Sequence, residues 1–191
     1  FGLQSQDYKR YEVIFVDSGS SDGSELIAKK NGCKIVKIKK EDFSFGRALN
    51  IGCKNAKGDY LVFLSAHVYP THTEWLSNLI DPLKENNRTA LVYGKQTGDM
   101  RTKFSEQQIF NKWFPAGCVK DQHDVFCNNA NCAIKKALWH EFPYDESLTG
   151  LEDLDFAKKI KKKGYAICYA SDAEIVHIHE AVSYTHLTLP T

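Results

Sequence analysis

A run of four β-favouring residues, 13–16, leads directly into a loop of acids, hydroxyls and glycines, and this junction constrains the fold more than any other feature. The run Val-Ile-Phe-Val is typical of a strand buried on both faces. Gly19 and Gly23 in the loop allow tight turns and close backbone approach. In open α/β sheets, ligands bind beyond the carboxyl ends of the strands. We therefore predict an α/β fold with Asp17 at a ligand-binding edge. A capped helix start at Ser21 or Asp22 is a second reading of the loop, which we adopt for Asp22, but it does not account for Asp17.

Strand and helix patterns alternate along the first part of the chain. Strands are predicted at 12–16, 33–38 and 60–64, and helices at 24–31 and 45–55. Two strand–helix–strand units of this kind predict parallel pairing with right-handed crossovers.

The second half of the chain is less regular. Helices are predicted at 73–85, 136–141 and 152–163, and strands at 91–94, 131–134, 165–169 and 173–177. Residues 95–124 carry few periodic signals, which is typical of a functional loop.

Length and charge limit the class of protein. The 191 residues fit one domain with a real core, and no apolar run reaches the roughly 20 residues that span a bilayer. With 25 basic and 24 acidic residues, the net charge of +1 gives no general case for nucleic acid as a partner. The six cysteines form no CxxC pair, which favours reduced thiols and a cytoplasmic protein over a zinc site. Because the chain begins at Phe1, the sequence leaves open whether a signal peptide or a membrane anchor lies upstream.

Four motifs in order carry a resemblance to a known family. They are Val-Asp-Ser-Gly-Ser-Ser-Asp-Gly-Ser at 16–24, Gly-Asp-Tyr-Leu-Val-Phe-Leu at 58–64, Gly-Leu-Glu-Asp-Leu-Asp at 150–155, and the histidines at 177 and 179. Together they resemble a family 2 glycosyltransferase over residues 8–180. The resemblance implies a GT-A fold: a Rossmann-like α/β domain whose mixed, mostly parallel sheet is flanked by helices. It also implies that a nucleotide-diphosphate sugar, a divalent cation and a hydroxyl acceptor meet there, and that transfer inverts the anomeric carbon.

The resemblance assigns two segments to the donor. Asp17 is similar to the acid that binds the nucleotide base, and Ser18 stands where many members have a second acid. A carboxylate accepts from a ring N–H, so Asp17 suits a pyrimidine such as uracil or thymine. Residues 43–50 resemble the stretch that closes over the donor, so Arg47 and Asn50 are expected there. Arg47 suits a phosphate or the base, although a solvent-facing position is an equal alternative.

The sequence departs from the family pattern at Ser65-Ala66-His67. The family usually has an Asp-x-Asp-like motif here, whose last acid binds the metal beside the diphosphate. Ser65 and Ala66 are still expected at the donor, and His67 becomes the metal ligand. An imidazole suits Mn²⁺ better than Mg²⁺, which prefers oxygen. The alternative is that the charge of the diphosphate is neutralised in another way.

We expect the rings of the two later histidines, which we take to alternate along a strand, to point to opposite faces. Only one of them can readily join the site. From the family's His-x-His ending we expect His179, rather than His177, to complete the metal site.

Glu152 and Asp153 follow Gly150 at the start of a predicted helix, where amides and the helix dipole favour negative charge. Inverting transfer needs a base that takes the proton of the acceptor hydroxyl. Asp153 matches the family's base, and Glu152 is expected to bind the acceptor or orient Asp153. The alternative is that both acids only cap the helix.

The acceptor side is predicted from residue chemistry. Asn129 and Asn131 carry amides that can both donate to and accept from sugar hydroxyls. Trp113, in the irregular segment, is the candidate for an acceptor-side wall. The acceptor class implied is a saccharide or a lipid-linked saccharide, which is compatible with work at the inner face of a membrane.

Both ends of the chain are expected to be atypical. Residues 1–182 are predicted to be the glycosyltransferase domain without its first strand, which puts the activity of such a fragment in doubt. Residues 183–191 match nothing in the family and are predicted to be a non-native tail. A catalytically degenerate nucleotide-sugar binder is the main alternative function, since an acid is missing at 65–67. A dinucleotide-binding domain is disfavoured because the Gly19–Gly23 spacing is not Gly-x-Gly-x-x-Gly.

Overall fold

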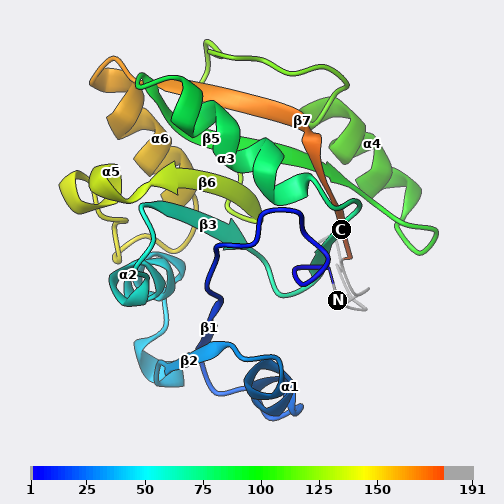
Figure 1. Ribbon diagram of the computed structural model, residues 1–191, viewed down its shortest axis with the longest axis vertical. Helices are drawn as coiled ribbons and strands as arrows, with labels where there is room; N and C mark the ends of the chain where they lie inside the picture. Colours follow the sequence, from blue (N-terminus) through cyan, green and yellow to red (C-terminus); the bar gives the residue numbers. More distant parts are fainter. Residues whose placement is uncertain (1, 179–191) are drawn as a thin grey trace, which may run out of the picture.

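The computed structural model describes residues 2–178, and they form two separate β-sheets with helices around them (Figure 1). The strands are β1 (Ile14–Asp17), β2 (Lys34–Lys37), β3 (Tyr60–Leu64), β4 (Val68–Pro70), β5 (Thr89–Thr97), β6 (Asn131–Lys135) and β7 (Ala166–His177). The helices are α1 (Ser24–Lys30), α2 (Phe45–Asn55), α3 (Trp75–Glu85), α4 (Phe104–Trp113), α5 (Lys136–Glu141) and α6 (Glu152–Lys162), with a 3₁₀ turn η1 (Lys40–Asp42).

The larger sheet has five strands in the order β3-β6-β5-β7-β4. Within it β3, β5 and β7 run in one direction, while β6 and β4 run in the other. The sheet is therefore mixed, as predicted. The expectation of a mostly parallel sheet holds for strand direction but is wrong for neighbouring pairs. Because β6 lies between β3 and β5, only β5 and β7 pair in parallel.

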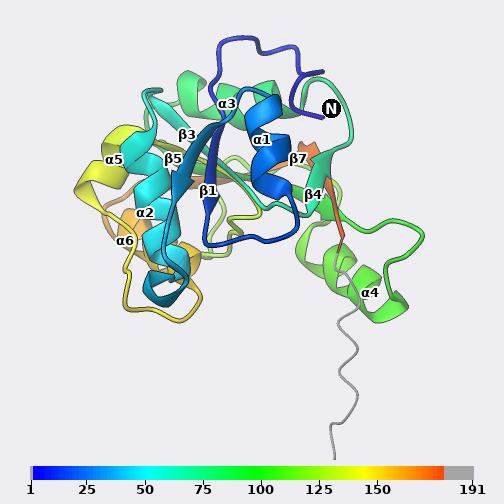
Figure 2. The same cartoon turned by 90° about the horizontal axis from the view of Figure 1, so that it is seen from below.

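The smaller sheet pairs β1 with β2 in parallel, from Ile14 opposite Lys34 to Asp17 opposite Lys37. Helices α1 and α2 lie on its two sides (Figure 2). The first predicted strand–helix–strand unit is thus confirmed. The second is not, because β3 belongs to the other sheet and does not pair with β2.

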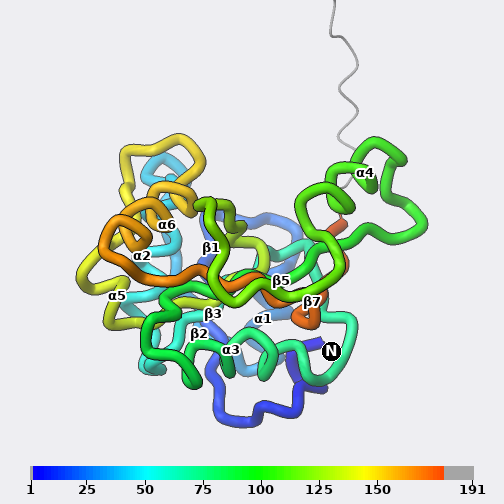
Figure 3. The backbone as a smooth tube through the Cα atoms, turned by 90° about the horizontal axis from the view of Figure 1, so that it is seen from above, coloured from blue at the N-terminus to red at the C-terminus, as the bar shows by residue number. Residues whose placement is uncertain are grey.

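Elements with strong local signals match the prediction closely. The helices at 45–55 and 136–141 and the strand at 60–64 have the predicted bounds. The two strands expected after residue 164 are one strand, β7, in which residues 171–174 bulge where its register with β5 shifts between Gly94 and Gln96. The segment 95–124 contains one helix that was not predicted, α4, which projects from the rest of the molecule (Figure 3).

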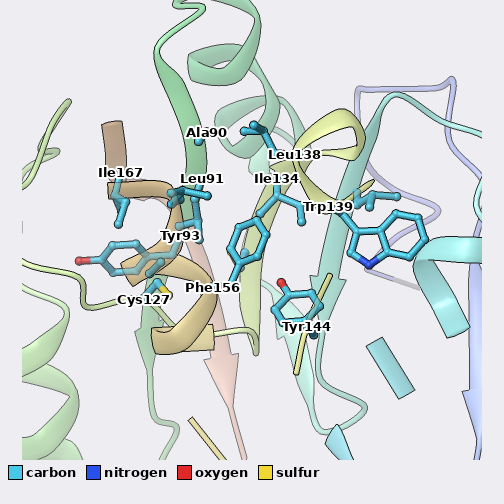
Figure 4. Close-up of a cluster of buried hydrophobic side chains, with 14 of the residues drawn as sticks. Ala90, Leu91, Tyr93, Cys127, Ile134, Leu138, Trp139, Tyr144, Phe156 and Ile167 are labelled. Carbon is cyan, nitrogen blue, oxygen red and sulfur yellow. The ribbon is translucent and has the colours of Figure 1, made fainter. Parts of the chain in front are cut away.

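Two clusters of buried side chains hold the larger sheet. On one face α3 packs against β5, β6 and β7, and its apolar residues on that side are all buried: Trp75, Leu76, Leu79, Ile80 and Leu83. On the other face α5 and α6 contribute Leu138, Trp139 and Phe156 to the second cluster (Figure 4). Trp139 is buried in this cluster.

Candidate active site at the carboxyl end of strand β3

Three segments meet where β3 ends. Leu64 pairs with Asn131, the first residue of β6, and the Ser65 amide donates to the Ala130 carbonyl oxygen at 3.3 Å. The Ser65-Ala66-His67 turn therefore lies beside the asparagine-rich loop that precedes β6. Ser65 is half-buried, whereas Ala66 and His67 are exposed. The motif in which the family pattern is broken thus lies at this sheet edge.

Asp153 joins this edge through the same loop. The Asn129 amide donates to Asp153 Oδ2 at 3.3 Å, and the Leu154 amide donates to Oδ1 at 2.8 Å. Helix α6 begins one residue earlier, after Leu151, whose φ of 64° makes the sharp turn that starts the helix. The carboxylate is thereby fixed by two amides, while each oxygen keeps a lone pair for another partner.

Burial raises the pKa values of both acids of the Glu-Asp motif. Loss of solvent raises the pKa of Asp153 above its usual value, although the amides of Leu154 and Asn129 act in the opposite sense. Burial also raises the pKa of Glu152, and the neighbouring charge of Asp153 adds to that rise. A carboxyl with a raised pKa is a stronger base when ionised, which suits proton abstraction.

The histidine that meets His67 is His177. The centroids of the two rings are 4.7 Å apart and their planes are inclined by 39°. Val68 pairs with His177 in the β4–β7 ladder, and the Ile178 amide donates to the His67 carbonyl oxygen at 3.0 Å. The choice of His179 over His177 falls on a residue outside the described part of the chain. The expectation that the two rings point to opposite faces is wrong, because residues two apart in a strand share one face, so the periodicity of the strand does not distinguish the two histidines.

The separation of the His67 and His177 rings matches that of two imidazoles sharing a divalent cation of the transition series. Metal–nitrogen bonds of about 2.1 Å place two imidazoles that share one cation roughly 4.5–5.5 Å apart between centroids, and the observed 4.7 Å lies in that range. Residues 2–178 contain no group of three or more His, Cys, Asp or Glu that could hold a metal. A cation at this pair would therefore need further ligands, such as phosphate oxygens of a donor.

Asp17 lies at the end of β1, in the smaller sheet. It is 4% exposed, and its carboxylate accepts from the amides of Gly19 and Ser20 at 3.1 Å each. The Ser20 hydroxyl lowers the pKa of Asp17 below its usual value, against the effect of burial. Ser18, beside it, is half-buried. The loop is thus built around the Asp17 carboxylate, while Asp22 accepts from the Ser24 amide at the start of α1.

The two α2 residues differ in what they can offer a donor. Arg47 is exposed, and its guanidinium makes long ion pairs of 3.9 Å with carboxylate oxygens of Asp42 and Glu146. Because these contacts are long, the guanidinium is available to a donor. Asn50 is not, because its amide makes four hydrogen bonds within the protein. Its Oδ1 accepts from Trp139 and from the Tyr144 amide, and its Nδ2 donates to the Tyr144 carbonyl and to Glu146. Asn50 was expected to contact the donor, but its side chain anchors the loop before α6 instead.

The two asparagines that were expected on the acceptor side differ in their burial. Asn131 is 0% exposed, and its side chain bonds to Trp75, Lys95 and Ala173, so an acceptor has no access to it. The prediction for Asn131 is corrected on this ground. Asn129, two residues earlier, is half-buried next to Asp153 and stays a candidate.

Trp113, at the end of α4, is 44% exposed and stacks on Phe126, with ring centroids 4.7 Å apart. An exposed, immobilised indole of this kind can serve as a wall for a sugar ring.

Comparisons with known proteins agree with this geometry. A sequence profile described as "Glycosyl transferase family 2" matches residues 2–144. An uncharacterized glycosyltransferase of Rickettsia typhi is 41% identical over 91 residues, which are 47% of this chain and 28% of that protein. The O-antigen chain rhamnosyltransferase RfbN of Salmonella typhimurium is 26% identical over 185 residues, covering 88% of this chain and 57% of its own length. The chain thus spans less than two thirds of the length of these relatives.

Solved structures match over nearly the whole chain. Mannosyltransferase PcManGT from Pyrobaculum calidifontis, in complex with GDP-Man and Mn²⁺, superposes with a TM-score of 0.73 at 20% identity, over 96% of this chain and 52% of that one. S. aureus TarS 1–349 in complex with UDP-GlcNAc gives a TM-score of 0.71 at 19% identity, over 97% and 56% of the two chains. These likenesses confirm the predicted GT-A fold. Within residues 2–178, no helix has the length and apolar character needed to cross a membrane.

Proposed function

Since this chain belongs to glycosyltransferase family 2, we propose that it is part of an inverting glycosyltransferase. It would move a sugar from a nucleotide-diphosphate donor to a hydroxyl of a saccharide or lipid-linked saccharide, in polysaccharide or glycolipid synthesis. The observation that carries this proposal is the placement of Asp153. A buried carboxyl with a raised pKa is held by the Asn129 amide, next to the turn that contains Ser65 and His67.

The chemistry assigned to Asp153 is proton transfer. Its ionised carboxylate takes the proton of the acceptor hydroxyl while that oxygen bonds to the anomeric carbon and the nucleoside diphosphate leaves. A positioned base of this kind contributes about 10²–10⁴-fold to the rate. Asn129 and Trp113 are proposed to contact the acceptor, and Glu152 to orient Asp153.

The donor is proposed to lie between the two sheets' ligand-binding ends. Asp17 and Ser18 would bind the base, Arg47 a phosphate, and Ser65 and Ala66 the donor beside them. His67 and His177 would hold a divalent cation, Mn²⁺ more readily than Mg²⁺, because both ligands are imidazoles. When bound, the cation would supply positive charge against the diphosphate. The names of two relatives support this chemistry, since PcManGT binds GDP-Man with Mn²⁺ and RfbN is an O-antigen rhamnosyltransferase.

A degenerate nucleotide-sugar binder is the second candidate. The observation in its favour is that no acid stands at 65–67, so the proposed cation site would offer two imidazoles in place of a carboxylate. Retention of Asp153 in a fixed, buried position argues for catalysis, because a binder has no use for a base.

A donor screen with one matched pair of variants tests the proposal. UDP-, GDP- and dTDP-sugars are offered with Mn²⁺, Mg²⁺ or EDTA, and both thermal shift and donor turnover are measured. Asp153→Asn should abolish turnover and keep the donor-induced thermal shift.

Asp155→Asn is the control, because Asp155 lies on the same turn of α6 but pairs with Lys159 at 2.6 Å. Donor binding without turnover in the unaltered chain would favour the binder. Equal turnover in Asp153→Asn and the control would refute the role of Asp153.

A further inference from the structure

Gln96 is a deeply buried polar residue that contacts the histidine pair. It lies near the end of β5 and is 2% exposed. Its Oε1 is 2.7 Å from Nδ1 of His177, which is itself 8% exposed. No sequence pattern marks a single glutamine in a strand, and the proposed function above gives this residue no role.

The contact has a definite chemical consequence for the imidazole. A neutral histidine carries its proton on one of its two ring nitrogens, and an amide oxygen can only accept. A bond from Nδ1 to Oε1 therefore requires the proton on Nδ1, and Nε2 keeps its lone pair. The opposite orientation of the amide would donate to Nδ1 and place the proton on Nε2, which could then not bind a cation.

The surroundings of Gln96 tie it to His177 rather than to another partner. Its Nε2 is buried and has no hydrogen-bond partner within the described part of the chain. The amide is therefore anchored through its oxygen, by His177.

An irregularity in the pairing of β5 with β7 brings the side chains of Gln96 and His177 together. The register shift between β5 and β7 places Gln96 opposite Ile175, two residues before His177. Asn131 holds both sides of that shift, since its Nδ2 donates to the Lys95 carbonyl at 3.0 Å and to the Ala173 carbonyl at 2.7 Å. The Gln96–His177 contact is thus set by buried hydrogen bonds and not by a mobile surface side chain.

We propose that Gln96 is a positioning residue that holds His177 in the tautomer protonated on Nδ1 and so presents Nε2, beside His67, to a divalent cation. This inference rests on the proposed function, which places a cation at the histidine pair. Hydrogen bonds from metal-binding histidines to a second residue commonly fix the ring in this way.

The first test reads the tautomer directly, in the metal-free chain. Two-bond ¹H–¹⁵N correlation spectra of ¹⁵N-histidine-labelled protein distinguish protonated Nδ1 from protonated Nε2, and His177→Gln assigns the signal. We expect protonation on Nδ1. Protonation on Nε2 would overturn the proposal, whatever the variants do.

The second test measures affinity for Mn²⁺ alone, by the electron paramagnetic resonance signal of the free ion. Gln96→Met keeps the length of the side chain but removes the acceptor, and we expect Mn²⁺ affinity to fall about 10–100-fold. Gln96→Glu keeps an acceptor at the same place and should retain affinity within a few fold. Gln6→Met is the matched control, because Gln6 is 1% exposed but bonds to Gly2, His72 and Leu76, away from the pair.

The outcomes distinguish failure of this inference from failure of the proposed function on which it rests. Unchanged Mn²⁺ affinity in Gln96→Met would refute the positioning role, even if the chain binds the ion tightly. Failure of the unaltered chain to bind Mn²⁺, with Nδ1 protonated, would refute the cation role and leave the contact between Gln96 and His177 as a structural one. If Gln96→Met does not fold, the tautomer of the unaltered chain still decides.

Discussion

Asn131→Ala separates the sequence-based reading of this residue from the structural one. In the sequence it was a candidate ligand for sugar hydroxyls. In the structure its fully buried amide accepts from Trp75 Nε1 at 2.9 Å and donates to the carbonyl oxygens of Lys95 and Ala173. The first reading predicts weaker acceptor binding in the variant. The second predicts loss of stability.

The magnitude follows from the three groups that would lose their partner. One buried indole N–H and two buried carbonyl oxygens would be left, and an unsatisfied buried group costs about 1–3 kcal/mol. The N–H is counted in the middle of that range and the carbonyls near its lower end. The free energy of unfolding should then fall by about 3–5 kcal/mol. This is a large part of the roughly 5–15 kcal/mol that stabilises a typical domain.

Urea unfolding, followed by tryptophan fluorescence, measures this loss. With a slope of about 2 kcal/mol per molar, the midpoint should fall by roughly 1.5–2.5 M. Asn129→Ala is the matched control. Its side chain accepts a long 3.4 Å bond from the Tyr144 hydroxyl and has a weak hydrogen bond to Glu152, so the substitution should shift the midpoint by less than about 0.7 M. An Asn131→Ala protein that unfolds at the same urea concentration as the unaltered chain would refute the reasoning.

Three further predictions follow from burial and charge. Burial raises the pKa of Asp153, so ionisation of this carboxyl lowers the stability of the fold as pH rises through the folded-state pKa. Asp153→Asn should therefore melt at a higher temperature than the unaltered chain near pH 7. The difference in melting temperature should shrink toward acid. Asp17 has a lowered pKa, so its stabilising contribution is present above the ordinary aspartate pKa and is lost as pH falls through the folded-state value. Asp17→Asn should accordingly melt at a lower temperature at pH 7 and converge with the unaltered chain in strong acid. A thiol reagent should label the exposed Cys118 in the native protein, whereas Cys53, whose pKa burial raises to about 12, and the fully buried Cys132 should react only after unfolding, as mass spectrometry of labelled peptides would report.

Sequence patterns predicted those elements whose signals are local. Helix α2 begins after Ser44, whose side chain accepts from the Arg47 amide, and the chain leaves the helix at Ala56, so both limits are encoded within a few residues. Strand β3 is a continuous apolar run. The family resemblance assigned residues 65–67 and Asp153 to one site and residue chemistry suggested Asn129, and the structure places these residues at one edge.

What the sequence did not predict depends on contacts between distant segments. Helix α4 buries a single residue, Phe110, and so lacks the apolar periodicity that identifies a helix. The bulge in β7 contains Ser171 and Asp172, which broke one strand into two apparent ones. Asn131 has the chemistry of a sugar ligand, and only its burial under Trp75 assigns it to the core.

The choice between His177 and His179 is of the same kind. Residues two apart in a strand point to the same face, so strand periodicity does not choose between the two histidines. The ladder between β4 and β7 shows that His177 lies beside His67.

That ladder also determines where the chain tolerates changes of length. Strand β4 meets β7 through three pairs, from Val68 opposite His177 to Pro70 opposite Ile175. Because His67 directly precedes this ladder, inserting or deleting one residue between 67 and 70 would shift the frame and turn one imidazole to the other side of the sheet. The turn at 98–103, between β5 and α4, contains no buried residue and lies outside the β4–β7 ladder, so its length can change without altering that frame. Engineered variation in loop length for new acceptors therefore belongs in the turn before α4, and the span from His67 to Pro70 should be kept residue for residue.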